Sequence, residues 1–328
     1  MDSSLYKDVV TPRGLKYHYY YYPAELGKHT LLFCHGFPSS SSDWSGIALY
    51  FKEQGYGLVI PDMLGYGGTD KPADPAMYIQ SAMSQDIVSI LDAERIEKVV
   101  AIGHDWGSAS VSRLANWYPE RVIAYAFLAV SYSPPRSKNY DYDVFLARLK
   151  QKYGYELFGY WGFFNRDDAD QVIQDHIESF MSLLWPYDPK YWIDRFARTG
   201  GIERTLHEDW TAPLPAYVSE ADKDVFIATF CSNGFVGPTC WYKTVLRGFS
   251  PADDDKRAYP PAGVPVFFGA AKNDYVCLPS LGYDVFKGEH FTEGQVTTKE
   301  YDADHWLILS KASEISRDLE AWIKTFTG

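Results

Sequence analysis

The chain has 328 residues, of which 46% are hydrophobic and 17% aromatic, and its formal net charge is −12. Such a composition is that of a globular protein with a full core, and the length allows one large domain or a domain with a substantial insertion. The acidic balance argues against nucleic acid or an anionic membrane surface as the main partner.

Targeting and redox signals favour the cytoplasm. The first residues, MDSSLYKDVV, lack the basic and apolar segments of a signal peptide, and the longest uncharged apolar stretch, VIAYAFLAV, is too short to span a bilayer. The four cysteines form no C-x-x-C pair and no metal-like cluster, so we expect buried thiols in a reducing compartment. They are Cys34, Cys231, Cys240 and Cys277.

The first part of the chain alternates short apolar strands with helices. KYHYYYYP (16–23) predicts a strand that pairs with residues 5–10 across a turn. Four more strands are expected, namely TLLFC (30–34), GLVIP (57–61), KVVAIG (98–103) and RVIAYAFLAV (121–130). The expected helices lie near 43–54, with an N-cap offered by a serine cluster and Asp43, near 78–93 and at 108–118. This order predicts a mostly parallel sheet flanked by helices, with the carboxyl ends of its strands at one ligand-binding edge.

The alternation stops at SYSPPRSK (131–138). From there to about residue 250 the sequence pattern predicts helices and is rich in Trp and Tyr. A proline- and charge-rich linker follows. The strand pattern then resumes in VPVFFGA (264–270) and GQVTTKEY (294–301), and KASEISRDLEAWIKTF closes the chain as an amphipathic helix. We therefore expect an α/β core made of residues 1–133 and 251–328, interrupted by a helical cap, 134–250.

GHDWGS (103–108), between the strand KVVAIG and the next helix, has the frame of a nucleophile elbow with Asp105 in the usual place of serine. A carboxylate with an ordinary pKa of about 3.9 is ionised at neutral pH and needs no base to activate it. It can displace a leaving group on an sp³ carbon, and the resulting ester needs a base and an oxyanion hole for its hydrolysis. The elbow thus indicates alkyl transfer, although alone it also fits a catalytically silent protein.

The base and its orienting acid are expected late in the chain, because the order in such folds is nucleophile, acid, histidine. Of the eight histidines, only His290 and His305 follow VPVFFGA, and only His305, in DADHW, lies in a loop before the final helix. Asp274, at the end of VFFGAAKND, follows a strand and is the candidate acid. Asp302 and Asp304, beside the histidine, could tune it, although solvated loop acids are the plainer interpretation.

The loop HGFP follows the strand TLLFC and should face the elbow. We expect the backbone N–H groups of Phe37 and Trp106 to form the oxyanion hole. We expect four residues to lie at the substrate: His35, Phe37, Pro38 and Trp106. Among them, His35 is expected to brace the loop rather than to act as a catalyst. The sharp turn would also fit a cis Phe37–Pro38 bond. His104, by strand alternation, should point away from the nucleophile. No motif for a metal or a cofactor occurs, so none is expected.

Together these motifs resemble the α/β-hydrolase fold and, within it, the soluble epoxide hydrolases. HGFP, DMLGYGGTDKP (62–72), GHDWG, the KND that ends at Asp274, and DHW stand in the order of that family. The resemblance covers roughly residues 12–133 and 263–328. It implies a small apolar epoxide and water as the only partners. It also implies an alkyl-enzyme ester on Asp105, hydrolysed by water that His305 activates.

The family uses two cap tyrosines to hold the epoxide oxygen, a task that suits a hydroxyl protonated at neutral pH. GPTCWYKTVL resembles the second cap motif and places one of them at Tyr242. GYWGFFNRDDAD resembles the first and places the other at Tyr160, with Trp161 in place of the polar residue of the family. Tyr153 and Tyr155 are the substitutes for Tyr160.

Two alternatives stay open. Haloalkane dehalogenases share most of these motifs and hold the halide with N–H donors, of which Trp106 could be one, but Phe37 stands where their Asn would. Spare tryptophans in the cap could supply a second donor: Trp161, Trp185, Trp192 and Trp210. A silent binding protein would be expected to lack a member of the catalytic set, and none is missing here. The oligomeric state is not indicated by any pattern.

Overall fold

A computed structural model of the chain describes residues 1–134, 140–249 and 259–327. In this part, eight strands form one sheet in the order β1-β2-β4-β3-β5-β6-β7-β8. The strands are β1 (Tyr6–Val10), β2 (Lys16–Tyr22), β3 (Thr30–Cys34), β4 (Gly57–Pro61), β5 (Val99–His104), β6 (Val122–Leu128), β7 (Val266–Ala271) and β8 (Val296–Tyr301). β1, β2 and β4 pair antiparallel, and every other neighbouring pair is parallel. The predicted mostly parallel sheet is therefore confirmed.

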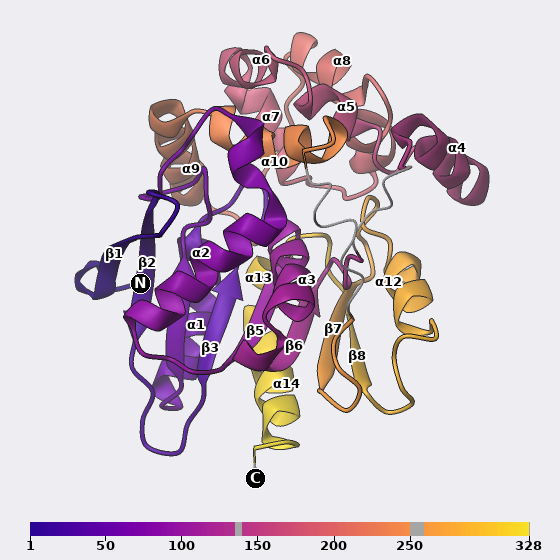
Figure 1. Cartoon of the computed structure of the whole chain (residues 1–328). Helices are drawn as coiled ribbons and strands as arrows, with labels where there is room; N and C mark the ends of the chain where they lie inside the picture. The colour runs from indigo at the N-terminus through magenta and orange to yellow at the C-terminus, as the bar shows by residue number, and fades with distance from the viewer. Residues whose placement is uncertain (135–139, 250–258, 328) are drawn as a thin grey trace.

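Helices cover both faces of this sheet, which explains why its central strands are continuous apolar runs (Figure 1). α1 and α14 share one apolar cluster on one face, and α2 and α3 share the cluster on the other. The helices of these layers are α1 (Ser45–Glu53), α2 (Gln80–Ala93), α3 (Trp106–Trp117), α12 (Pro279–Phe286), α13 (Leu307–Ser310) and α14 (Ala312–Lys324). Short 3₁₀ turns accompany them: η1 (Ser3–Leu5), η2 (Ser41–Trp44), η3 (Pro75–Tyr78) and η4 (Pro119–Arg121).

Between β6 and β7 the chain forms a set of helices, called here the inserted helices. They are α4 (Tyr142–Tyr153), α5 (Tyr160–Phe164), α6 (Ala169–Asp175), α7 (Ile177–Leu184), the π-helix η5 (Trp192–Ala197), α8 (Gly201–His207), α9 (Glu220–Asn233) and α10 (Val236–Leu246). They gather beyond one end of the sheet, on the side to which β5 leads into α3 (Figure 1). The predicted division into core and cap has its second boundary at residue 250, which lies outside the described residues.

Several local expectations need correction. α1 begins at Ser45, and the preceding turn η2 is capped by Ser40 of the predicted serine cluster rather than by Asp43. α12 was not expected, although Pro279 at its first turn is a helix-start signal. Cys231 is exposed on α9, so the expectation of buried thiols is wrong there.

Every described peptide bond is trans, including Phe37–Pro38. Within the described ranges, none of the helices combines the length and apolarity that crossing a membrane requires.

Candidate active site

Asp105 lies at the junction of β5 and α3, with φ +53° and ψ −124°. A positive φ is a strained conformation for a residue with a Cβ, and such strain persists where the surrounding structure imposes it. The two flanking glycines allow the turn: a Cβ on Gly107 would collide with the Cys34 carbonyl, and one on Gly103 would collide with the first turn of α3. The G-x-D-x-G frame is therefore a steric requirement of the turn, which presents Asp105 at the carboxyl edge of the sheet.

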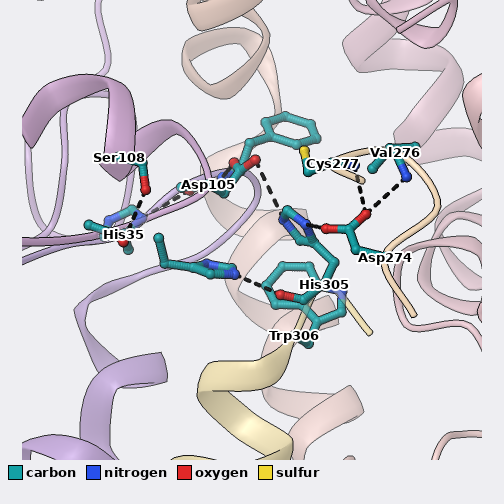
Figure 2. A network of polar contacts seen from close by, with 12 residues as sticks. His35, Asp105, Ser108, Asp274, Val276, Cys277, His305 and Trp306 are labelled. Carbon is teal, nitrogen blue, oxygen red and sulfur yellow. Dashed lines mark hydrogen bonds and ion pairs between the residues drawn. The ribbon is translucent and has the colours of Figure 1, made fainter. Parts of the chain in front are cut away.

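Asp105 is held from two sides. The backbone N–H of Phe37 donates to Asp105 Oδ1 over 2.7 Å, and His305 Nε2 lies 3.5 Å from Asp105 Oδ2. Figure 2 shows the His305 ring between the carboxylates of Asp105 and Asp274. The N–H of Phe37 thus binds one oxygen of the Asp105 carboxylate, and its part in an oxyanion hole stays a prediction. The Trp106 N–H, the second predicted donor, heads α3, and its part in an oxyanion hole stays a prediction.

Asp274 orients His305. Its Oδ2 lies 2.7 Å from His305 Nδ1, and its Oδ1 accepts the backbone N–H groups of Val276 and Cys277 over 2.9 and 2.8 Å (Figure 2). Because Asp274 is almost fully buried and held by three donors, it fixes the imidazole with Nδ1 as the donor and turns Nε2 toward Asp105. His104 donates through Nε2 to the His305 carbonyl over 2.8 Å, so it braces the histidine from behind.

Neighbouring charges and hydrogen bonds together outweigh burial in setting the pKa values of Asp105 and His305. Burial alone would raise the pKa of Asp105, but the hydrogen bond and charge of His305, with the Phe37 N–H, hold it below its ordinary value. Burial would lower the pKa of His305, yet the charge of Asp274 and the hydrogen bond to Asp105 raise it well above its ordinary value. The two acidic neighbours therefore favour the charged, imidazolium form of His305.

Tyr160 begins α5 and Tyr242 lies on α10, and the structure brings both to Asp105. Their ring centroids are 6.0 Å apart, and burial raises the pKa of each well above its ordinary value. Both hydroxyls therefore stay protonated at neutral pH. Tyr155, the suggested substitute, donates its hydroxyl to the Tyr275 carbonyl over 2.7 Å and is engaged elsewhere.

Two hollows share Asp105 and Tyr160 in their linings. A small one, of about 10 Å³, is lined by Phe37, Asp105, Tyr160, Leu184, Trp192, Phe196, Tyr242, Val276, His305 and Trp306. A larger one, of about 420 Å³, is lined by Asp105, Trp106, Tyr160 and apolar residues of α4, α5 and α12. His35 and Pro38 line neither. Met63 N–H donates to His35 Nε2, and Nδ1 faces the Gly36 carbonyl, so the ring braces the loop. A role of either residue at the substrate stays a prediction.

The interpretation of Asp304 as a solvated loop acid is wrong, because its side chain is buried. It accepts the Tyr217 hydroxyl over 2.6 Å and the Trp306 N–H over 2.9 Å, so it ties the loop of His305 to the inserted helices. Asp302 is exposed and accepts Asn273, as expected for a loop acid. Nothing in the sequence pointed to Tyr217, which stands 87 positions before Asp304.

Cys277 was also missed as a neighbour of the site. Asp274, Cys277 and His305 bring one possible ligand atom each within 4.8 Å, the only such trio among the described residues. Burial raises the pKa of the Cys277 thiol to about 12, which disfavours the thiolate that a metal would require. The Asp274 oxygens are already taken by N–H donors. This donor set favours hydrogen bonding over metal binding.

Comparison with known proteins agrees with this geometry. A family model described as "alpha/beta hydrolase fold" matches residues 29–311. The chain belongs to this α/β-hydrolase family. Bifunctional epoxide hydrolase 2 of Mus musculus is 28% identical over 323 residues, which cover 97% of this chain and 55% of the mouse protein. An epoxide hydrolase of Caballeronia sordidicola is 29% identical over 306 residues, covering 90% of this chain and 87% of that protein.

Solved structures give the same picture. Epoxide hydrolase A from Mycobacterium thermoresistibile matches with a TM-score of 0.77 and 26% identity, over 97% of this chain and 98% of that one. An epoxide hydrolase from an endophytic Streptomyces has a TM-score of 0.80 at 24% identity, over 97% and 95% of the two chains, and supports the fold. The resemblance predicted from the motifs is confirmed. This α/β-hydrolase spans about half the length of the mammalian relatives that it matches.

Proposed function

We propose that this α/β-hydrolase is an epoxide hydrolase, which adds water to a small apolar epoxide and releases a vicinal diol. One observation carries the proposal: Asp105, His305, Tyr160 and Tyr242 line the same small hollow. A nucleophile, a base and two protonated hydroxyls thus converge on one point, as ring opening followed by ester hydrolysis requires. The names of the similar proteins support the same activity. Residues 134–250 act in it as a cap that supplies both tyrosines.

In the first step, an Asp105 oxygen attacks an epoxide carbon and the C–O bond of the ring breaks. The released oxygen takes a proton from Tyr160 or Tyr242, whose raised pKa keeps a proton in place for it. Ester formation removes the charge of Asp105 and thus lowers the pKa of His305. The imidazolium therefore gives up its proton, which restores the tyrosinate to a neutral tyrosine, and the product is an alkyl ester beside a neutral imidazole.

In the second step, neutral His305 takes a proton from a water molecule that attacks the Asp105 carbonyl carbon. The oxyanion is held by the Phe37 N–H and the predicted Trp106 N–H. When the tetrahedral intermediate collapses, the bond between the acyl carbon and the alkyl oxygen breaks, and the diol leaves with the proton from His305. The Asp105 acid then ionises and returns a proton to His305, so the cycle is balanced.

The test is the intact mass of the His305→Gln variant after brief exposure to styrene oxide and, separately, to a 1-bromoalkane. Alkylation needs no base, so the variant is expected to keep an adduct with the full mass of the epoxide. The double variant Asp105→Asn/His305→Gln is the control and should form no adduct. An adduct from the bromoalkane alone, with bromide released, would identify a dehalogenase. No adduct from either compound, with no diol from the wild-type protein on an epoxide panel, would overturn the proposal in favour of a silent protein.

A further inference from the structure

The two hollows beside Asp105 differ greatly in volume. Asp105 and Tyr160 line both of them, so an epoxide attacked by Asp105 and held by Tyr160 has one hollow on either side in which its substituents could lie. One side offers about 420 Å³ and the other about 10 Å³. The space for substituents is therefore almost entirely on one side of the ring.

The large hollow suits one bulky apolar group. Trp161 packs against Trp106 with ring centroids 5.3 Å apart, and Phe158 and Leu281 complete an aromatic and aliphatic wall. A volume of about 420 Å³ lies within the usual range of ligand pockets and exceeds the needs of a phenyl ring or a short alkyl chain. A large substituent on one epoxide carbon can be buried here.

The small hollow has room for about one water molecule. His305 and Asp105 both line it, so this is where the hydrolytic water must stand. Its outer wall is formed by Trp192 and Phe196, two aromatic residues one π-helical turn apart on η5. π-helical turns often occur at functional sites, and this one places both rings on the same face.

This wall is firmly packed. The rings of Trp192 and Phe196 stack at 4.9 Å and 19°, and Phe196 also lies 4.6 Å from the ring of Tyr160. Trp192 faces His305 at 5.5 Å and donates its indole N–H to the Leu183 carbonyl over 2.6 Å. Both aromatic side chains are about 4% exposed. Moving them to admit a substituent would break the hydrogen bond and disrupt a close-packed cluster.

We infer that the site accepts epoxides that carry all their substituents on one carbon, and that Trp192 and Phe196 enforce this choice. The substituted carbon faces the large hollow, and a CH₂ carbon faces the small one. A group on the second carbon would collide with the wall and would displace the water that His305 activates. The inference rests on the proposed function and specifies its substrate class: terminal epoxides with one bulky apolar or aryl group.

The experiment compares two isomers, α-methylstyrene oxide and trans-β-methylstyrene oxide, which differ only in the carbon that bears the methyl group. For the wild-type protein we expect kcat/KM to favour the α-isomer by about 100-fold, the discrimination that one misplaced methyl group can give. Phe196→Ala opens the wall and should reduce that ratio at least about tenfold. Phe145→Ala, which enlarges the other hollow, is the matched control and should change both isomers alike and keep the ratio.

The Phe196→Leu variant should reduce the same kcat/KM ratio by a smaller factor. It replaces the alanine variant if circular dichroism shows that the latter does not fold. The inference is wrong if the wild-type protein hydrolyses both isomers within a few-fold of each other, or if opening the wall leaves the ratio unchanged. A failure of the proposed function would look different, because neither isomer nor styrene oxide would then yield a diol with any variant.

Discussion

Asp105 and His305 form an ion pair that the first step of the proposed mechanism would remove. Burial would lower the pKa of His305, but the charge of Asp274 and the hydrogen bond to Asp105 raise it well above its ordinary value. In the proposed mechanism, alkylation of Asp105 would leave only Asp274 beside the ring, so the same histidine would change from an acid that returns a proton into a base that takes one from water. The loss of one neighbouring charge would thus be enough to change the role of the histidine.

The two tyrosines should share the work of ring opening. Tyr160→Phe or Tyr242→Phe is expected to slow alkylation about 100-fold, the usual contribution of a positioned proton donor, while the remaining hydroxyl preserves measurable activity. The double variant should lose alkylation almost entirely. Single-turnover quenching of tryptophan fluorescence measures the rate, since Trp106 packs on Tyr242 at 5.1 Å. An unchanged rate in the double variant would remove both tyrosines from the mechanism.

The pH dependence of the two half-reactions should differ. Because the pKa of Asp105 lies below its ordinary value and those of Tyr160 and Tyr242 lie well above theirs, the nucleophile is ionised and both acids are protonated from about pH 5 to pH 10. Alkylation should be flat over this range. Ester hydrolysis needs neutral His305, so it should slow as pH falls and protonates that ring. Rapid-quench mass spectrometry should find more alkyl-enzyme at pH 5 than at pH 8, and equal amounts would contradict the role of His305.

The elbow between β5 and α3 is expected to tolerate substitution poorly. Gly107→Ala would place a Cβ against the Cys34 carbonyl, a backbone atom of the neighbouring strand that cannot move aside, so we expect a loss of about 3 kcal/mol in the free energy of unfolding. Gly162→Ala on α5 is the control, because its nearest neighbour, the Tyr142 hydroxyl, lies at 3.8 Å. That change should be neutral or slightly stabilising. Urea titrations measure both, and similar values would refute the steric argument.

Sequence patterns predict the elements whose environment is simple. Strands buried on both faces are apolar runs, so β3 to β7 were recognisable, and the order of motifs along them placed Asp105, Asp274 and His305 at one edge. Positions set by distant partners were not predictable. The burial of Asp304 depends on Tyr217, and the wall on η5 depends on a π-helical turn that no local pattern announces. The resemblance to a family, rather than spacing, found Tyr160 and Tyr242.

At the scale of the whole molecule, one apolar cluster spans the core and the inserted helices. Its members include Leu114 of α3, Phe268 of β7 and Trp241 of α10. Hydrogen bonds cross the same boundary: Trp241 donates to the Leu64 carbonyl, and Trp306 donates to that of Leu184. Inserted helices joined to the core in this way cannot unfold without exposing the apolar surface of both parts.

We therefore expect the inserted helices and the sheet to unfold together. In hydrogen exchange at increasing urea, peptides from α10 and from β7 should lose protection at the same concentration. Tyr217→Phe removes the hydrogen bond to Asp304. It should lower the free energies of unfolding measured at α10 and at β7 equally, by about 1–3 kcal/mol, because the acceptor is a buried carboxyl. Tyr187→Phe, at an exposed residue, is the control and should change neither. Loss of protection in α10 at a lower urea concentration than in β7 would instead make the inserted helices an independent unit, and the Tyr217 variant would then destabilise that unit alone.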